Sequence, residues 1–207
     1  MLCASGVDWI GFPLRLPVHK EDVSEPEAAG IIGGLQAGVE GVLITYECDA
    51  LSLRTLARRV GARVVQIHGE MSLHELKRLR CLAPQLQVIK SVVIGAPEWH
   101  NPCARIASYL PFVHGFITDT FDARSGARGA TGRTHDWSVS REIVAACPKP
   151  VILAGGLTPD NVADAVAAVR PAGVDAHTGV EAKNGDKDPR RVVEFCRAAR
   201  EAAQNIR

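Results

Sequence analysis

Short apolar runs alternate along the chain with segments whose apolar residues recur at helical spacing. The runs are rich in Val and Ile, a pattern typical of parallel strands with apolar side chains on both faces. Seven strands are predicted on this basis, at residues 7–12, 41–45, 64–68, 88–93, 116–118, 151–154 and 174–176. We expect each strand to be covered on both faces by the rest of the fold.

Several of the intervening helices carry recognisable start signals. Ser72 followed by Glu75 has the spacing of a capping box. Thr158 and Asp188 each precede a proline, the residue favoured at the first helical position, so both are predicted N-caps. Further helices are predicted at residues 25–35, 53–60, 102–110 and 138–146.

Successive strand-then-helix units indicate a parallel sheet with right-handed crossovers. Two architectures fit this alternation, a doubly wound open sheet and a (βα)8 barrel. The doubly wound dinucleotide-binding fold would carry G-x-G-x-x-G after its first strand, and the sequence has no such motif. A barrel needs eight strands, one more than the pattern predicts.

Composition and charge narrow the functional classes. A chain of 207 residues with 46% hydrophobic and 23% charged residues is typical of one globular domain, which we place over residues 1–207. A net charge of +1 favours neither nucleic acid nor an anionic membrane as a partner, and no apolar run is long enough to span a bilayer. The six cysteines and seven histidines lack zinc-ligand spacing, which predicts free thiols, a cytoplasmic location and no metal site.

Polar residues stand at the ends of predicted strands, where a barrel places its functional groups. Gln66 and His68 end the third strand, and Asp119 directly follows the fifth. Asp119 could be a general acid if burial raised its pKa, or it could cap a helix or brace a loop. His68 could orient a substrate or move a proton, or it could be a core histidine with an internal hydrogen bond.

Two glycine-bearing loops late in the chain predict a phosphate site. Gly155 and Gly156 follow the sixth strand. Asp175, Thr178 and Gly179 lie at the end of the seventh strand and in the loop after it. Such loops expose N–H groups that bind phosphate, and barrels often build phosphate sites from their last two loops. The alternative is that the glycines only form turns and helix caps.

Six segments form a series along the chain: VQIHGE, FITDT, GATGRTHDW, ILAGGLTPDNV, GVDAHTGVE and GDKD. Together they resemble the phosphoribosylanthranilate isomerase family, and the resemblance extends from Gly6 to the C-terminus. Its most specific part is LAGGLTPDNV combined with GVD-x-x-x-GVE and a following KD. The resemblance implies a TIM-type (βα)8 barrel and an enzyme of tryptophan biosynthesis that uses neither metal nor cofactor.

The resemblance also implies the chemistry, an Amadori rearrangement of an aminoaldose phosphate to an aminoketose. In the family a general acid protonates the furanose ring oxygen, and a general base then removes the C2 proton of the resulting imine. The acid of the family matches Asp119. The substrate-binding and phosphate-binding positions of the family match, respectively, Gln66, His68 and Asp175, and Gly155, Gly156, Thr178 and Gly179.

Two positions depart from the family. Its general base is a cysteine in a K-I-C-G segment on the first strand, which this sequence does not contain, and Cys3 does not match it. We therefore expect residues 7–12 to correspond to the second barrel strand and the first βα unit to be missing. Glu21 stands where the family has an arginine that holds the anthranilate carboxylate. The exchange removes a bidentate hydrogen-bond donor and puts a second negative charge beside the substrate carboxylate.

Three interpretations follow. The first is an N-(5'-phosphoribosyl)anthranilate isomerase-like enzyme. The second is an isomerase or binding protein for another phosphorylated aminosugar. Glu21 would motivate it, and so would His177, which together with Thr178 replaces the serines that the family has before GVE. The third is a non-catalytic relative, if the general base is genuinely lost. In each case the predicted partner is a small phosphorylated aminosugar, and the protein acts as a monomer or homodimer.

Overall fold

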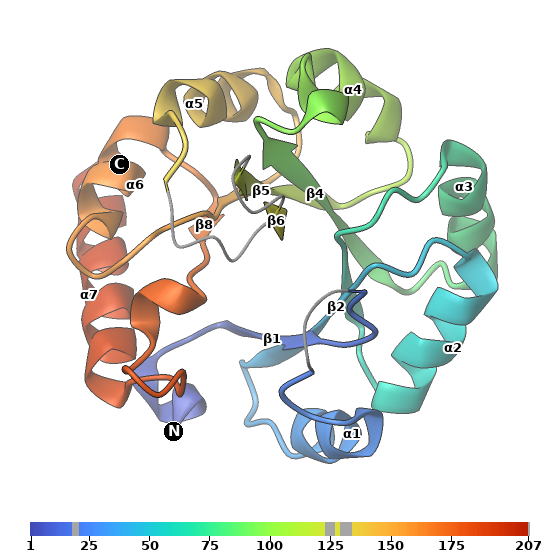
Figure 1. Ribbon diagram of the computed structural model, residues 1–207, viewed down its shortest axis with the longest axis horizontal. Helices are drawn as coiled ribbons and strands as arrows, with labels where there is room; N and C mark the ends of the chain where they lie inside the picture. The colour runs from blue at the N-terminus through green and yellow to red at the C-terminus, as the bar shows by residue number, and fades with distance from the viewer. Residues whose placement is uncertain (18–20, 123–126, 129–133, 207) are drawn as a thin grey trace. The chain divides into compact units, whose positions relative to one another are not determined.

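The computed structural model describes residues 1–17, 21–122, 127–128 and 134–206 (Figure 1). The GATGR part of GATGRTHDW lies outside these residues. The chain divides into two units, each of which is described by itself. The β1–β4 unit comprises Val7–Ser91 and Ser108–His114, and the β5–β8 unit comprises Met1–Gly6, Val92–Ala107 and Gly115–Arg207.

Parallel strands alternate with helices in the β1–β4 unit. Its elements are β1 (Trp9–Pro13), α1 (Glu25–Gly33), β2 (Glu40–Thr45), α2 (Ala50–Val60), β3 (Val64–Ile67), α3 (Leu73–Leu82) and β4 (Gln87–Ile94), the last of which continues into the other unit. The strands pair in chain order and in parallel. The three helices lie along the same side of these strands (Figure 1). The strands predicted at 7–12, 41–45, 64–68 and 88–93 are thereby confirmed.

The hydrophobic spacing of α2 shows how the sequence directs this packing. Leu53, Leu56, Ala57 and Val60 recur at helical spacing, and each is at most 1% exposed. They therefore form one apolar stripe that the helix buries, as the i, i+3, i+4, i+7 pattern predicts. Gly61 ends the helix in the left-handed conformation, which glycine adopts without steric cost.

The β5–β8 unit repeats the same alternation. Its elements are η1 (Leu2–Ser5), η2 (Pro97–Trp99), α4 (Pro102–Tyr109, with its last residues in the other unit), β5 (Gly115–Asp122), β6 (Ala127–Arg128), α5 (Trp137–Ala146), β7 (Val151–Leu153), α6 (Val162–Val169), β8 (Gly173–Val174), η3 (Thr178–Val180) and α7 (Pro189–Asn205). β5, β7 and β8 pair in parallel, which confirms the three remaining predicted strands. β6 pairs antiparallel with the end of β5 and was not predicted, because two residues are too few to show a periodic pattern.

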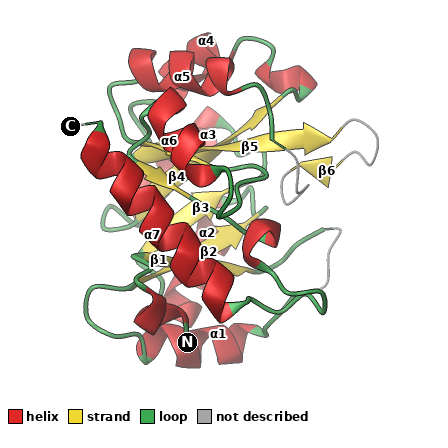
Figure 2. Ribbon diagram, turned by 90° about the vertical axis from the view of Figure 1, so that its left-hand side faces the viewer, coloured by secondary structure: helices red, strands yellow, loops and turns green. Residues whose placement is uncertain are grey.

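The N-terminal turn η1 packs against α7 within the β5–β8 unit. Figure 2 shows α7 as the long helix that passes beside the N-terminus. The Arg200 guanidinium on α7 donates a hydrogen bond to the Gly6 carbonyl. This contact ties the beginning of the chain to its last helix.

Two of the predicted helix starts differ from the structure. Ser72 accepts a hydrogen bond from the Glu75 N–H (3.2 Å), as a capping box requires. The Glu75 carboxylate, however, accepts from the Ala50 N–H (2.8 Å) at the start of α2, so the return bond of the predicted box is replaced by a tertiary contact. A reciprocal capping box instead begins α1, between Ser24 and Glu27.

Thr158 is not the N-cap of the next helix, because α6 begins only at Val162 and Asn161 precedes it. The Asn161 side chain bonds back to the loop, accepting from the Thr158 N–H (2.8 Å) and donating to the Gly156 carbonyl (3.1 Å). The loop therefore extends past the proline that the sequence pattern takes as the helix start. Asp188 does cap α7 as predicted, accepting from the Arg190 N–H at 2.8 Å.

One buried side chain contradicts the expectation of apolar strand faces. Lys90 on β4 is 0% exposed, and its Nζ donates to the carbonyls of Gly69 (3.1 Å), Ser91 (3.1 Å) and Ile67 (3.4 Å). An ammonium group has three donors, and these carbonyls satisfy all of them, which offsets part of the cost of desolvating the charge.

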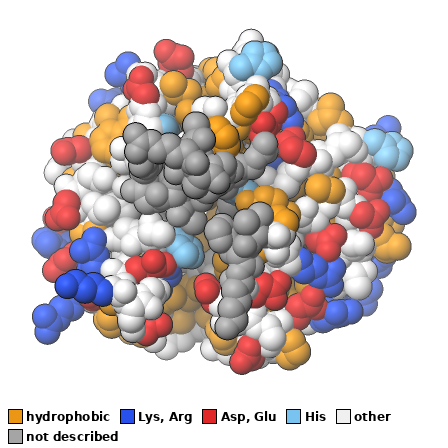
Figure 3. All heavy atoms as spheres, in the orientation of Figure 1, with side chains coloured by type: hydrophobic (Ala, Val, Ile, Leu, Met, Phe, Trp, Pro, Cys, Tyr) orange, Lys and Arg blue, Asp and Glu red, His pale blue; other side chains and the backbone are white. Residues whose placement is uncertain are grey.

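Charged side chains of both signs are interspersed over α2 and α3 on the face shown in Figure 3. Some form ion pairs, such as Arg78 with Asp49 (3.4 Å). This mixture is consistent with the small net charge of the chain. No helix among the described residues is long and apolar enough to cross a membrane.

Lys90→Met should lower the free energy of unfolding by about 2 kcal/mol, because it leaves buried carbonyls without their donor. The matched control is Lys77→Met on the exposed face of α3, which should change stability by less than about 0.5 kcal/mol. Urea denaturation of the three proteins measures the difference. Equal stability of both variants would show that the buried ammonium contributes nothing.

Candidate functional site

The predicted site residues of the β1–β4 unit meet at one serine. Gln66 on β3 donates from Nε2 to Ser91 Oγ (3.1 Å), and His68 Nδ1 lies 3.0 Å from the same oxygen. Gln66 is 9% exposed and His68 8%. The Tyr46 ring packs on the imidazole, with centroids 4.8 Å apart. The two predicted residues are therefore held in fixed positions by a shared partner and by burial.

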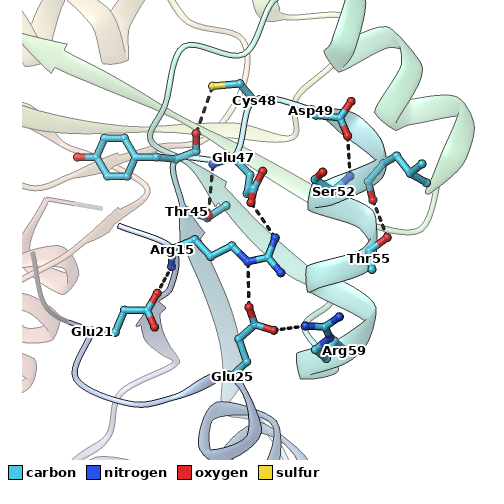
Figure 4. Close-up of polar contacts among 12 residues, drawn as sticks. Arg15, Glu21, Glu25, Thr45, Glu47, Cys48, Asp49, Ser52, Thr55 and Arg59 are labelled. Atoms are coloured by element: carbon cyan, nitrogen blue, oxygen red, sulfur yellow. Dashed lines mark hydrogen bonds and ion pairs between the residues drawn. The ribbon is translucent and has the colours of Figure 1, made fainter. Parts of the chain in front are cut away.

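An ion-pair cluster follows β1 in the same unit (Figure 4). The Arg15 guanidinium contacts Glu25 Oε1 (2.9 Å) through Nε and Glu47 Oε1 (2.7 Å) through Nη1. Arg59 binds the other oxygen of Glu25 at 2.7 Å. The hydrogen bonds that the Arg15 guanidinium donates to Glu47 and to Glu25 raise the pKa of Arg15, and the same guanidinium lowers the pKa of Glu25.

Glu21, which the resemblance matches to an arginine, adjoins this cluster. Its carboxylate accepts a hydrogen bond from the Arg15 backbone N–H, where Arg15 adopts a left-handed φ of 56°. The guanidinium of Arg15 is meanwhile engaged by Glu25 and Glu47. The departure from the family therefore lies within a local network rather than at an isolated surface carboxylate.

Asp119 lies on β5 in the β5–β8 unit, and its environment favours the protonated form. Burial raises the pKa of its carboxyl to about 7, and the negative charge of Asp175 contributes in the same direction. The Thr120 N–H donates to Asp119 Oδ1 (2.8 Å), which opposes the rise in pKa without cancelling it. A carboxyl that still holds its proton near neutral pH can serve as a general acid.

Asp175 follows β8, and its N–H donates to the Leu153 carbonyl (2.9 Å) on β7. The residue keeps solvent-accessible surface, yet the surrounding protein desolvates its carboxyl enough to raise its pKa. The positive charges of His177 and Lys187 act in the opposite direction. The negative charge of Asp175 therefore adds to the rise in the pKa of Asp119 that burial causes.

A histidine that the sequence did not single out braces this region. His135 Nδ1 lies 3.0 Å from Thr120 Oγ1, and its Nε2 lies 2.6 Å from the Oγ of Ser140, a fully buried residue. Burial lowers the pKa of His135 to about 4, so the imidazole is neutral at pH 7. Local spacing could not reveal this role, because Thr120 and His135 are 15 residues apart in the sequence.

The first predicted phosphate loop has glycines where side chains would not fit. Gly155 and Gly156 have φ angles of 99° and 65°, a conformation that other residues rarely adopt. A Cβ atom on Gly155 would overlap Thr120 Oγ1 and approach His135 Nδ1 to 3.3 Å. The loop therefore packs directly against the residue that follows Asp119.

The second predicted phosphate loop packs against the first. A Cβ atom on Gly179 would overlap the Leu157 carbonyl oxygen, so the two loops touch through their backbones. Thr178 and Gly179 begin the short turn η3. Nearby, Glu181 Oε1 pairs with Lys187 Nζ (2.6 Å) and with His177 Nδ1 (3.1 Å).

The structure therefore brings the predicted residues together within each unit. Gln66 and His68 share Ser91 in one unit. In the other unit, Asp119 is coupled to Asp175, and the two glycine loops adjoin each other. Among the described residues there is no group of His, Cys, Asp and Glu side chains that could hold a metal ion.

Comparison with known proteins identifies a family. The sequence model described as N-(5'phosphoribosyl)anthranilate (PRA) isomerase matches residues 16–198. An N-(5'-phosphoribosyl)anthranilate isomerase of Haloferax volcanii is 40% identical over 200 residues, which cover 96% of this chain and 86% of that protein. N-(5'-phosphoribosyl)anthranilate isomerase 2 of Methanosarcina mazei is 35% identical over 202 residues, with coverage of 97% and 88%.

A solved structure extends the similarity to the backbone. The crystal structure of phosphoribosyl anthranilate isomerase in complex with reduced 1-(o-carboxyphenylamino)-1-deoxyribulose 5-phosphate matches with a TM-score of 0.78 and 28% sequence identity. The match covers 97% of this chain and 91% of that one. This likeness, together with the seven parallel strands among the described residues, confirms the predicted fold class, a TIM-type (βα)8 barrel of which seven βα units are seen.

Asp119→Asn should stabilise the fold at high pH. A folded-state pKa near 7 lies above the unfolded value of about 4, so stability is lost as pH rises between these values. The variant should therefore unfold with a free energy roughly 2–4 kcal/mol higher than wild type at pH 8, and with little difference at pH 4. Urea denaturation at both pH values measures this. A stability difference that does not depend on pH would contradict the raised pKa.

Proposed function

The chain belongs to the N-(5'-phosphoribosyl)anthranilate isomerase family, and we propose that it converts N-(5'-phosphoribosyl)anthranilate to 1-(o-carboxyphenylamino)-1-deoxyribulose 5-phosphate. This makes it an isomerase of tryptophan biosynthesis. The observation that carries the proposal is a carboxyl with a pKa of about 7, Asp119, in the same unit as two adjoining glycine loops. The relatives support this substrate rather than another aminosugar or a non-catalytic role.

Asp119 acts as the general acid of the first step. It transfers its proton to the furanose ring oxygen while the bond from C1 to that oxygen breaks. The lone pair of the substrate nitrogen forms the C1–N double bond, which gives an open-chain protonated imine. Its C2 proton is then transferred to a general base, a role for which none of the predicted residues stands, and the resulting neutral enolamine tautomerises to the ketone. A pKa close to the working pH suits this role, because the acid is both protonated and able to release its proton.

The remaining predicted residues bind the substrate. The N–H groups around Gly155, Gly156, Thr178 and Gly179 receive the phosphate, since loops of this kind present donors to an anion. Asp175, in the same unit, orients the rest of the molecule. Gln66 and His68 keep the substrate-binding role that the resemblance to the family implies. The chemistry requires neither a metal nor a cofactor. A single domain over residues 1–207, a cytoplasmic location and a monomeric or homodimeric state remain part of the proposal.

The proposal is tested by incubating the purified protein with N-(5'-phosphoribosyl)anthranilate and following the ketose product by chromatography. We expect product to form, and the gene should restore growth of an isomerase-deficient tryptophan auxotroph without added tryptophan. A folded protein that forms no product and does not complement the strain would overturn the proposed function.

Asp119→Asn should reduce kcat by about a hundredfold or more, because the amide cannot supply the proton. Inhibition by inorganic phosphate should be unchanged, since the glycine loops are intact. Asp164→Asn, an exposed aspartate on α6, is the matched control and should retain full activity. Near-normal turnover by Asp119→Asn would exclude this residue as the acid.

The activity of the wild-type protein should fall as pH rises above about 7, because Asp119 must carry a proton to act as an acid. We expect kcat to drop about tenfold per pH unit in that range. The residual kcat of Asp119→Asn should not show this decline with rising pH. If the variant and wild type lose activity in parallel with pH, another group is responsible for the decline.

A further inference from the structure

Arg191, in the first turn of α7, contacts the second glycine loop through its whole guanidinium edge. Its Nε (3.1 Å) and Nη2 (2.8 Å) both donate to the Gly179 carbonyl oxygen. The side chain is half-buried. Two donors in one rigid plane fix the direction of that carbonyl more firmly than a single hydrogen bond would.

The carbonyl that Arg191 contacts belongs to a glycine with a very close backbone neighbour. Gly179 lies against Leu157, whose carbonyl oxygen a Cβ atom would overlap. The loop at 177–180 is thus confined on one side by the first glycine loop. Arg191 holds it from the side of α7. The Gly179 Cα therefore lies against Leu157 while the Gly179 carbonyl points to Arg191.

The backbone around Arg191 is also tied to this loop. Asp188 Oδ1 accepts from the Arg191 N–H (3.3 Å), and the Asp188 N–H donates to the Val180 carbonyl (2.9 Å). Within the described part of the chain, the N–H groups of Thr178 and Gly179 have no protein acceptor. The loop is therefore rigid on its carbonyl side and has donors available on its N–H side.

We propose that Arg191 is a positioning residue, which fixes the Gly179–Val180 peptide through the Gly179 carbonyl and thereby holds the neighbouring N–H groups of Thr178 and Gly179 in place to receive the substrate phosphate. It acts through Gly179 and does not itself contact the phosphate. This inference rests on the proposed phosphate site at the two glycine loops. Its consequence is that the geometry of the two donors, and not the positive charge alone, sets phosphate affinity.

The test compares Arg191→Gln, Arg191→Lys and the matched control Arg190→Gln. Arg190 is the adjacent exposed residue of α7, and its substitution removes the same charge. Binding of inorganic phosphate is measured by calorimetry, together with KM and kcat for N-(5'-phosphoribosyl)anthranilate. Thermal melting reports whether each variant is folded.

We expect Arg191→Gln to weaken phosphate binding and raise KM by about tenfold in parallel, with kcat little changed. Arg191→Lys keeps the positive charge but loses the two donors in one plane, so its affinity for phosphate should lie between those of wild type and Arg191→Gln. Arg190→Gln should match wild type. If Arg191→Gln does not fold, the comparison of Arg191→Lys with wild type still decides the question.

Three results would overturn the inference: a lower melting temperature of Arg191→Gln with unchanged phosphate affinity, full affinity in Arg191→Lys, or equal weakening by Arg190→Gln. A different result would contradict the proposed function. A wild-type protein that binds phosphate but does not isomerise the substrate would contradict the function, while the calorimetric comparison would still test Arg191.

Discussion

The close backbone approach of Gly179 to Leu157 shapes the candidate phosphate site. Because a side chain at position 179 would overlap the Leu157 carbonyl, the loops after β7 and β8 can adjoin only through glycine. A second close approach of this kind occurs at Gly155, where the missing side chain leaves room for Thr120. These close approaches bring backbone donors from separate loops into one region, where an anion can be bound without a dedicated cationic side chain.

The raised pKa of Asp119 in the β5–β8 unit lowers the stability of the fold and favours acid catalysis. Burial and the charge of Asp175 raise the pKa of Asp119, which costs folding free energy whenever the carboxyl is ionised. Burial also keeps His135 neutral, so this histidine braces Thr120 without adding a cation that would lower the pKa of Asp119. Asp119 can therefore act as a proton donor near neutral pH because its neighbours among the described residues exclude water and carry no positive charge next to it.

The sequence predicted the strands well and the polar details less well. All seven strands were found, because apolar runs of this length are a property of the local sequence. The missed features depend on distant partners. Glu75 completes no capping box because its carboxylate binds the start of α2. Lys90 is buried because carbonyls from a neighbouring strand and loop surround its ammonium.

The sequence by itself determined the βα alternation, the candidate acid and both glycine loops, since strand periodicity and short motifs are encoded within a few residues of one another. Only the tertiary structure decided the pKa of Asp119, the engagement of Arg15 by two carboxylates and the hold of Arg191 on Gly179. Burial and through-space charge arise between residues that are far apart in the chain. Their effects become defined only when folding brings those residues together and excludes water.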